Sequence, residues 1–556
     1  MRRVKLNGEK TIMILENYQK WLRLSKDKEI KDELVSINGK NEEIEDRFYR
    51  VLSFGTGGLR GIIGAGTNRM NIYTVSRATF GLAEYLLSIG GDSIVIAYDS
   101  RNKSSEFARL AAEIMSSRGI KAYLFSELTP TPVLSFAVRY LQASAGIVIT
   151  ASHNPKEYNG YKVYNSFGCQ ITDEAADAIT EKINQYDYFN DFMPKQNLIE
   201  ILDERVKNAF IEAIKAISLT KITEKNAPVV VYSPLHGTGR RYVTRILREI
   251  GVKELYVVAE QEAPDANFTT CCYPNPEEKE ALAFALRDAE KYKPDVVLAT
   301  DPDADRIGVA LPNEKGEYFL LNGNETGVLI MDYMLSRKSE KNVLGENPTI
   351  IKTIVTTDMA FEVAKTYNAK VKEVLTGFKY VGEELDKTEN YIMGLEESYG
   401  YLVGNHARDK DAVSAAMMIV EMCAYYKREG KKLYEILKIL YERYGYYLTD
   451  LDSFKYEGQS GMTTMSVIIE KIRNAPFKKI DGEEVEFTDF SKGVNGLPQS
   501  NVLRFKNDNI RLIIRPSGTE PKLKIYYQVK GKTEQDCNIK LKRLMDYVRH
   551  FVGKGK

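Results

Sequence analysis

Residues 147–164 read IVITASHNPKEYNGYKVY, and this stretch decides the fold class. Its β-branched beginning is typical of a buried strand, and the Asn154-Pro dipeptide that follows is typical of a turn. Ser152 thus stands where the strand ends, and the carboxyl ends of strands in α/β sheets face the ligand. We therefore expect Ser152 and His153 to face a ligand, together with Lys162 from a second short strand. Taken alone, a serine at this place is more typical of a turn or a helix cap than of a nucleophile.

A second strand ending carries three aspartates, Asp301, Asp303 and Asp305, at alternating positions after an apolar run. Alternating side chains of an extended segment point the same way, which would bring the three carboxylates together. Such carboxylates repel each other unless a cation lies between them, and oxygen ligands beside a phosphate favour Mg²⁺. An EF-hand is excluded, because Arg306 stands where its loop needs glycine and Pro312 where it needs glutamate. The remaining alternative is an exposed acidic turn. Arg306 is a candidate for neutralising a phosphoryl group.

The glycine-rich loop 54–61, FGTGGLRG, invites a nucleotide-binding interpretation that its spacing excludes. The dinucleotide pattern G-x-G-x-x-G fails because Arg60 occupies its last glycine position, and the P-loop pattern fails because Thr67 replaces its lysine. What remains is a flexible loop that carries one guanidinium group.

Two further loops suggest recognition of a sugar and of its phosphate. Glu396 and Ser398 lie between glycines, and a carboxylate and a hydroxyl two positions apart can hold neighbouring sugar hydroxyls. The loop that begins at Arg515 offers a guanidinium group, hydroxyls and a glycine that frees backbone amides, which together suit a phosphate. Its other candidate residues are Ser517, Gly518 and Thr519. By itself each loop is more typical of an exposed polar turn or a hairpin.

With these four motifs in the same order, the chain resembles the α-D-phosphohexomutases, the phosphoglucomutase and phosphomannomutase group, over nearly its whole length. The resemblance implies that Ser152 carries a phosphoryl group and binds Mg²⁺ together with the three aspartates. It also implies that Arg60 and Lys162 lie near the reacting hydroxyl, and we expect Lys162 to transfer the proton with assistance from His153. Further substrate-binding residues implied by the resemblance, besides Glu396 and Ser398, are Lys410, Gly377 and Phe378.

The reaction implied by this resemblance interconverts glucose 1-phosphate and glucose 6-phosphate, with glucose 1,6-bisphosphate as intermediate and activator. Mannose and pentose phosphates remain open as substrates, although the EESYG sequence at residues 396–400 is closer to the glucomutase branch and its phosphopentomutase subgroup. Two alternatives from other classes are a serine-dependent phosphatase and a sugar-phosphate sensor without catalysis. The hydrolase motif G-x-S-x-G is absent, since Thr150 and Asn154 occupy its glycine positions, and a sensor would not need every motif residue.

Length and strand pattern predict several domains. Apolar strands followed by helices begin near residues 94, 228 and 348, which predicts three related α/β units. We expect three mixed α/β domains and a smaller C-terminal α+β domain around a central cleft. The predicted limits are 1–195 for an N-terminal helical extension with the catalytic-serine domain, 196–322 for the metal-binding domain, 323–446 for the sugar-recognition domain and 447–556 for the phosphate-binding domain.

Charge and cysteine content exclude several classes of partner. With 78 Lys and Arg against 77 Asp and Glu, the chain has no charge excess that would favour nucleic acid. A run of about 18 apolar residues is absent, as is a signal-peptide core, so no contact with a membrane is expected. Five cysteines without paired spacing fit a reducing compartment and predict a cytoplasmic protein. The expected partners are small sugar phosphates, and the sequence does not indicate which oligomeric state the protein has.

Overall fold

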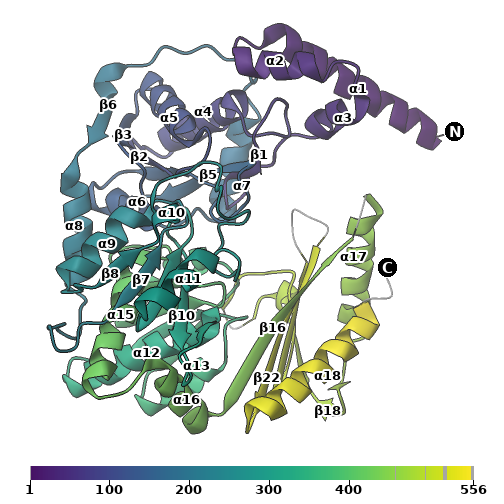
Figure 1. Ribbon diagram of the computed structural model, residues 1–556. Helices are drawn as coiled ribbons and strands as arrows, with labels where there is room; N and C mark the ends of the chain where they lie inside the picture. The colour runs from purple at the N-terminus through teal and green to yellow at the C-terminus, as the bar shows by residue number, and fades with distance from the viewer. Residues whose placement is uncertain (1, 457–458, 495, 517–521, 553–556) are drawn as a thin grey trace. The chain divides into compact units, whose positions relative to one another are not determined.

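The computed structural model describes residues 2–456, 459–494, 496–516 and 522–552 (Figure 1). The described residues form two compact units, each of which contains more than one β-sheet. The first unit comprises Met1–Asn322, Leu385–Lys387 and Ser398–Glu429, and the second comprises Gly323–Glu384, Thr388–Glu397 and Gly430–Lys556. Because each unit holds more than one sheet, the four predicted domain limits stay predictions.

Three helices precede the first sheet: α1 (Arg2–Leu24), α2 (Lys28–Ser36) and α3 (Asn41–Phe48). Trp21 of α1 is fully buried, and its ring packs edge-on against Phe48, Tyr73 and Phe189 at centroid distances of 5.4–5.8 Å. Such aromatic contacts stabilise beyond the area that they bury. The helical extension is therefore attached to the first domain through an aromatic cluster.

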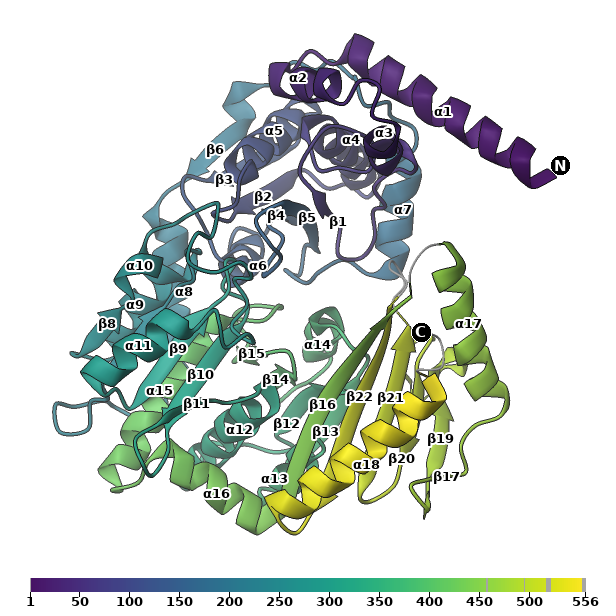
Figure 2. The same cartoon turned by 45° about the vertical axis from the view of Figure 1, so that its right-hand side comes forward.

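The first sheet has the order β1-β5-β4-β2-β3-β6 and mixes parallel with antiparallel pairs. Its strands are β1 (Leu59–Ile62), β2 (Ser93–Tyr98), β3 (Lys121–Phe125), β4 (Ala145–Ile149), β5 (Tyr158–Asn165) and β6 (Ile199–Leu202). The helices of this region are α4 (Ile72–Ser88), α5 (Ser104–Ser117), α6 (Thr131–Tyr140), α7 (Asp173–Ile183) and α8 (Glu204–Lys215). Every residue of β4 is buried, as expected for a strand covered on both faces. Figure 2 shows α5 and α6 on opposite faces of this sheet.

The second sheet of the first unit has the order β11-β10-β9-β7-β8. Its strands are β7 (Val230–Ser233), β8 (Leu255–Val257), β9 (Val296–Thr300), β10 (Ile307–Pro312) and β11 (Tyr318–Leu320). The helices are α9 (Gly239–Glu249), α10 (Ala259–Glu262), α11 (Ala283–Tyr292) and α15 (Ala412–Arg428). Strand β15 (Gly400–Val403) also belongs to this unit but is not part of this sheet. Antiparallel pairing of Ile307 with Thr300 makes residues 301–306 the connection of a hairpin. The predicted aspartates therefore lie in a turn at the end of β9.

The second unit contains a parallel sheet and an antiparallel sheet. Parallel strands β12 (Thr349–Thr353), β13 (Lys370–Val374) and β14 (Tyr391–Glu396) occur with helices α12 (Gly323–Glu340), α13 (Met359–Thr366), α14 (Phe378–Leu385) and α16 (Leu433–Tyr444). The C-terminal sheet has the order β16-β22-β21-β20-β19, with β16 (Tyr446–Lys455), β19 (Glu486–Asp489), β20 (Leu503–Lys506), β21 (Ile510–Pro516) and β22 (Lys522–Gly531). Helix α18 (Glu534–Val552) packs on β16 and β22 (Figure 2). This region also contains helix α17 (Gln459–Asn474) and a hairpin of strands β17 (Lys479–Ile480) and β18 (Glu483–Glu484). Three α/β sheets and one antiparallel sheet with helices confirm the predicted fold class.

A buried network of charges joins the parallel sheet to the C-terminal sheet within the second unit. Asp358, at the N-cap of α13, lies 3.2 Å from Lys352 Nζ and 3.0 Å from Lys506 Nζ, and it also pairs with Arg511 of β21. Lys352 is fully buried and reaches Glu373 Oε1 at 2.8 Å. Burial raises the pKa of Asp358, but Arg511, Lys352 and Lys506 together lower it well below its ordinary value of 3.8. The network fixes β21, which leads into the predicted phosphate loop.

Asp358→Asn should lower the free energy of unfolding of the second unit by about 3–5 kcal/mol, because Lys352 and Arg511 would stay buried without their shared carboxylate. Hydrogen exchange of the β21 amides measures the loss. The control is Glu362→Gln on the same helix, whose half-exposed pair with Lys530 should contribute about 0–1 kcal/mol. Since the pKa of Asp358 is lowered on folding, its contribution is present above 3.8 and is lost as the pH falls below that value. Equal exchange in the two variants would contradict the role of the network.

Candidate active site

Ser152 occupies a strained turn directly after β4. Its φ of 51° lies in the left-handed region, which costs a serine about 1–3 kcal/mol and persists only where the surroundings hold it. The residue is 4% exposed, and its N–H donates to Thr150 Oγ1 at 2.8 Å. The Ser152 hydroxyl donates to Asp301 Oδ2 at 2.8 Å and lies 3.2 Å from His153 Nδ1. The two predicted strand endings are thus in direct contact.

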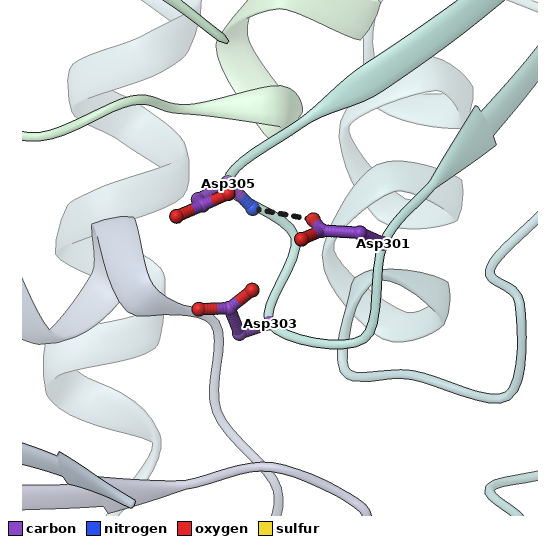
Figure 3. Close-up of side chains that lie close together, drawn as sticks. All are labelled: Asp301, Asp303 and Asp305. Atoms are coloured by element: carbon purple, nitrogen blue, oxygen red, sulfur yellow. Dashed lines mark hydrogen bonds between the residues drawn. The ribbon is translucent and has the colours of Figure 1, made fainter. Parts of the chain in front are cut away.

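The three aspartates are gathered by a turn. Figure 3 shows their carboxylates converging, with the Asp305 N–H donating to Asp301 Oδ1 at 3.1 Å. One ligand atom from each of Asp301, Asp303 and Asp305 lies within 4.8 Å of the others, and all three residues are buried. The expectation of an extended segment is wrong, because Ala304 has a φ of 51° and reverses the chain between the two strands of the hairpin. The carboxylates converge for this reason and not because of strand pleating.

The donor set of this turn fits a hard divalent cation. Among the described residues, Asp303 Oδ1 and Asp305 Oδ1 are buried and have no hydrogen-bond partner. The hydroxyl of Thr131, the first residue of α6, donates to Asp303 Oδ2 at 2.8 Å and so fixes the orientation of this carboxylate. Burial, with the Asp303 and Asp305 carboxylates, raises the pKa of Asp301 well above its ordinary value of 3.8. Crowded, desolvated oxygen ligands of this kind are those that divalent metal sites use.

Two lysines neutralise part of this acidic group. Lys162 Nζ lies 2.7 Å from Asp303 Oδ2 and 3.4 Å from Asp305 Oδ2, and Lys410 Nζ lies 3.2 Å from Asp305 Oδ2. Burial lowers the pKa of Lys162, but Asp303 and Asp305 outweigh this effect, so the pKa is raised above 10.5. Burial also raises the pKa of Asp305, but the positive charges of Lys410, Lys162 and Arg306 outweigh burial, so the pKa of this carboxyl lies below its ordinary value of 3.8. While Asp303 and Asp305 carry their negative charges, Lys162 is a cation paired with them.

His153, Arg60 and Arg306 complete the surroundings of Ser152. Burial lowers the pKa of His153 well below 6.5, and Arg306 and Arg60 lower it further, so the imidazole is neutral. Arg60 lies on β1 opposite Gly160 and donates to Asn154 Oδ1 at 3.1 Å. Arg306 donates to Glu277 Oε1 at 2.5 Å. The site therefore combines a hydroxyl, a neutral base and several cations.

The first unit brings most of the predicted residues together, and the remainder belong to the second unit. Ser398 lies in the first unit beside Tyr399, whose carbonyl accepts the Ile307 N–H at 3.1 Å at the end of the aspartate turn. In the second unit the Gly377 N–H donates to Glu396 Oε1 at 3.0 Å. Also in the second unit, Phe378 is buried at the start of α14, and Arg515 lies in β21 opposite Lys524. The predicted residues Ser517, Gly518 and Thr519 lie outside the described residues.

Comparison with known proteins shows the family. The models "Phosphoglucomutase/phosphomannomutase, alpha/beta/alpha domain" I, II and III match residues 51–189, 208–315 and 322–444, and the model of the C-terminal domain matches 469–540. The chain belongs to the phosphoglucomutase/phosphomannomutase family. Members of this family are isomerases that transfer a phosphoryl group. The resemblance seen in the sequence is therefore confirmed.

Individual relatives cover most of the chain. A phosphoglucomutase of Staphylococcus haemolyticus is 37% identical over 507 residues, which are 87% of this chain and 91% of the relative. A Haemophilus influenzae protein named "Probable phosphomannomutase" is 37% identical over 491 residues, 87% of this chain and 98% of the relative. The crystal structure of a Paramecium phosphoglucomutase, parafusin, is 17% identical, covers 90% of this chain and 96% of its own, and has a TM-score of 0.69. The fold of the phosphohexomutase family is thus shared beyond the range of clear sequence similarity.

Three side chains around the candidate site were not predicted. Arg101 pairs with Asp99 and donates to backbone carbonyls of the Ser152 turn, Thr131 holds Asp303, and Asp409 accepts from Tyr164 OH at 2.8 Å. A signal existed for Arg101, because it follows β2, the parallel neighbour of β4, and therefore lies at the same sheet edge as Ser152. Thr131 and Asp409 carry no such signal, since their contacts join segments more than a hundred residues apart.

The aspartate turn predicts one divalent cation site per chain. Mn²⁺ should bind the wild type in a titration followed by electron paramagnetic resonance, since carboxylate sites accept Mn²⁺ in place of Mg²⁺. Asp303→Asn should weaken binding by about 100-fold or more, because loss of one hard anionic ligand reduces both charge and ligand number. The control is Asp295→Asn at the opposite end of β9, where the carboxylate accepts from the Val229 N–H and should leave Mn²⁺ affinity unchanged. Equal affinity in the two variants would place the metal elsewhere.

Proposed function

We propose that this chain interconverts glucose 1-phosphate and glucose 6-phosphate through a phosphoryl group carried on Ser152, with glucose 1,6-bisphosphate as intermediate. The observation that carries the proposal is the 2.8 Å contact of the Ser152 hydroxyl with Asp301, at the edge of a buried group of three carboxylates. The 37% identity to a phosphoglucomutase over most of both chains supports glucose as the sugar.

Asp301, Asp303 and Asp305 would hold Mg²⁺ together with an oxygen of the phosphoryl group on Ser152. When bound, the ion offsets the negative charge of the transferred phosphoryl group. Phosphoryl transfer involves little covalent chemistry for the protein, so positioning and electrostatics provide most of the rate. Arg306 and Arg60 add positive charge beside the Ser152 turn, as their common effect on His153 shows.

Proton transfer accompanies each exchange of the phosphoryl group. The substrate hydroxyl forms a bond to phosphorus, the bond from phosphorus to Ser152 Oγ breaks, and Oγ recovers a proton. We assign the role of proton acceptor for the substrate hydroxyl to Lys162 in its uncharged form, which requires that the charges of Asp303 and Asp305 be neutralised. Neutral His153, 3.2 Å from Oγ, can relay one proton to Oγ by accepting a proton on one ring nitrogen while it donates from the other, so that one proton is taken up for each one delivered. Burial lowers the pKa of Lys162 and the two aspartates raise it, so its charge depends on whether those carboxylates are neutralised.

Substrate-binding roles are assigned residue by residue. Glu396 and Ser398 would hold sugar hydroxyls, with Gly377 and Phe378 orienting the ring. Lys410 would contact the sugar and the Arg515 loop would bind the phosphate that is not transferred, including Ser517, Gly518 and Thr519. Within the second unit, the hydrogen bond from the Gly377 N–H to Glu396 supports a common role for these two residues.

Mannose 1-phosphate is the second candidate substrate, because the Haemophilus influenzae relative named as a phosphomannomutase is also 37% identical. A coupled assay that compares glucose, mannose, ribose and deoxyribose 1-phosphates at equal concentration decides between them. The proposal expects the highest kcat/KM for glucose 1-phosphate. A higher value for a pentose or mannose phosphate would reassign the substrate and leave the phosphoserine chemistry in place.

Ser152→Ala should abolish isomerisation and the incorporation of phosphate from glucose 1,6-bisphosphate, since no other described residue offers a hydroxyl to Asp301 Oδ2. Intact-protein mass spectrometry measures the incorporation, and circular dichroism checks that the fold is kept. The control is Ser144→Ala, which lies before β4 as Ser152 lies after it and should behave as the wild type. Isomerase activity retained by Ser152→Ala would remove the proposed nucleophile.

Arg515→Ala should raise KM by about 10- to 100-fold and change kcat less, because a charge-assisted hydrogen bond to the phosphate would be lost. Steady-state kinetics with glucose 1-phosphate measure both constants. Lys524→Ala removes a cation directly opposite Arg515 in the sheet and is the matched control, with little change expected. If KM is the same in both variants, the phosphate is bound elsewhere.

A further inference from the structure

Arg101 makes a set of contacts that a purely structural arginine does not need. Its side chain is fully buried. One guanidinium nitrogen donates to the carbonyl oxygens of Pro155 at 2.8 Å and Tyr158 at 3.2 Å. The other donates to the carbonyl oxygens of Ser152 and, at 2.6 Å, Asn154. Four carbonyls of residues 152–158 therefore converge on a single cation.

The guanidinium group is itself held on two further sides. Its Nε lies 3.1 Å from Asp99 Oδ2, and the other oxygen of Asp99 accepts from the Arg101 N–H at 3.0 Å and from Ser104 Oγ at 2.7 Å. The ring of Phe268 lies 5.0 Å from the guanidinium carbon, in the range of a cation–π contact. Phe268 comes from the loop between α10 and α11, so Arg101 joins the first sheet of the unit to a segment that belongs to the region of the second sheet.

We propose that Arg101 is a positioning residue for phosphoryl transfer, which holds the Ser152 turn so that the hydroxyl faces Asp301. This inference rests on the proposed function. The left-handed backbone of Ser152 is unfavourable by itself, and the guanidinium group binds the carbonyl of Ser152 and three carbonyls that follow it in the chain. An arginine is required because its rigid fork presents donors to four acceptors at once, whereas a lysine offers three donors from one nitrogen.

The expected consequence is specific to the transfer step. A displacement of about 1 Å of a reacting group can cost about 100-fold in rate, while the parts that bind the sugar are unaffected. Arg101→Lys keeps the buried charge but loses the fork. It should lower kcat by about 100-fold and leave KM for glucose 1-phosphate within about 3-fold. The single-turnover rate of Ser152 phosphorylation by glucose 1,6-bisphosphate should fall by the same factor as kcat.

Arg77→Lys is the matched control, because Arg77 also donates to a carbonyl, that of Tyr186 at 2.9 Å, and also lies 5.0 Å from an aromatic ring, that of Tyr188. It makes no contact with the Ser152 turn and should keep wild-type kcat. Chemical rescue distinguishes a positioning role from a general loss of stability. Methylguanidinium added to Arg101→Ala should restore phosphorylation of Ser152. The same compound added to Arg77→Lys should have no effect.

The outcomes separate this inference from the proposed function. If the wild type fails to isomerise any of the four sugar phosphates, the proposed function is wrong. If the wild type is active and Arg101→Lys keeps kcat within about 3-fold of Arg77→Lys, the positioning role is wrong. Should Arg101→Lys fail to fold, Phe268→Leu decides, because it loosens one side of the guanidinium group. A lowered kcat with unchanged KM supports the inference, and unchanged kcat overturns it.

Discussion

Three carboxylates that lie within 4.8 Å of one another, away from water, require compensating positive charge. The chain supplies part of it through Lys162, Lys410 and Arg306, which are drawn from three separate segments. Two aspartate oxygens still have no hydrogen-bond partner among the described residues. The carboxylates suit a divalent cation, and the basic side chains suit a phosphoryl group. The Ser152 hydroxyl lies at the edge of this group of charges.

The fold brings these groups together because strands end at shared edges. Ser152 follows β4, Arg101 follows the parallel neighbour β2, and the aspartates follow β9 of the next sheet. Strands β4 and β9 are short apolar runs that are buried along their whole length, so polar residues are found where these strands end. In the second unit, the charged network around Asp358 fixes the position of β21. Buried ion pairs of this kind fix position at a cost in desolvation.

Much of the site could be predicted from the sequence because its signals are local. Ser152, Asp301 and Asp305 follow apolar runs, and turn residues mark where those runs end. The shape of the aspartate turn could not be predicted, since the left-handed Ala304 depends on the hairpin between β9 and β10. Thr131 was missed because its partner Asp303 lies 172 residues away. The raised pKa of Lys162 also depends on tertiary packing, because its cause is the position of Asp303 and Asp305.

The central claim is that a phosphoryl group on Ser152 shares a cation with the three aspartates. Phosphorus-31 NMR of the phosphorylated enzyme during a titration with Mn²⁺ tests it most directly, because a paramagnetic ion broadens the resonance of a phosphorus atom bound beside it. The account predicts that the phosphoserine resonance disappears as the site fills, and that it stays sharp at the same Mn²⁺ concentrations in Asp305→Asn. A sharp resonance in the wild type at full occupancy would contradict the account.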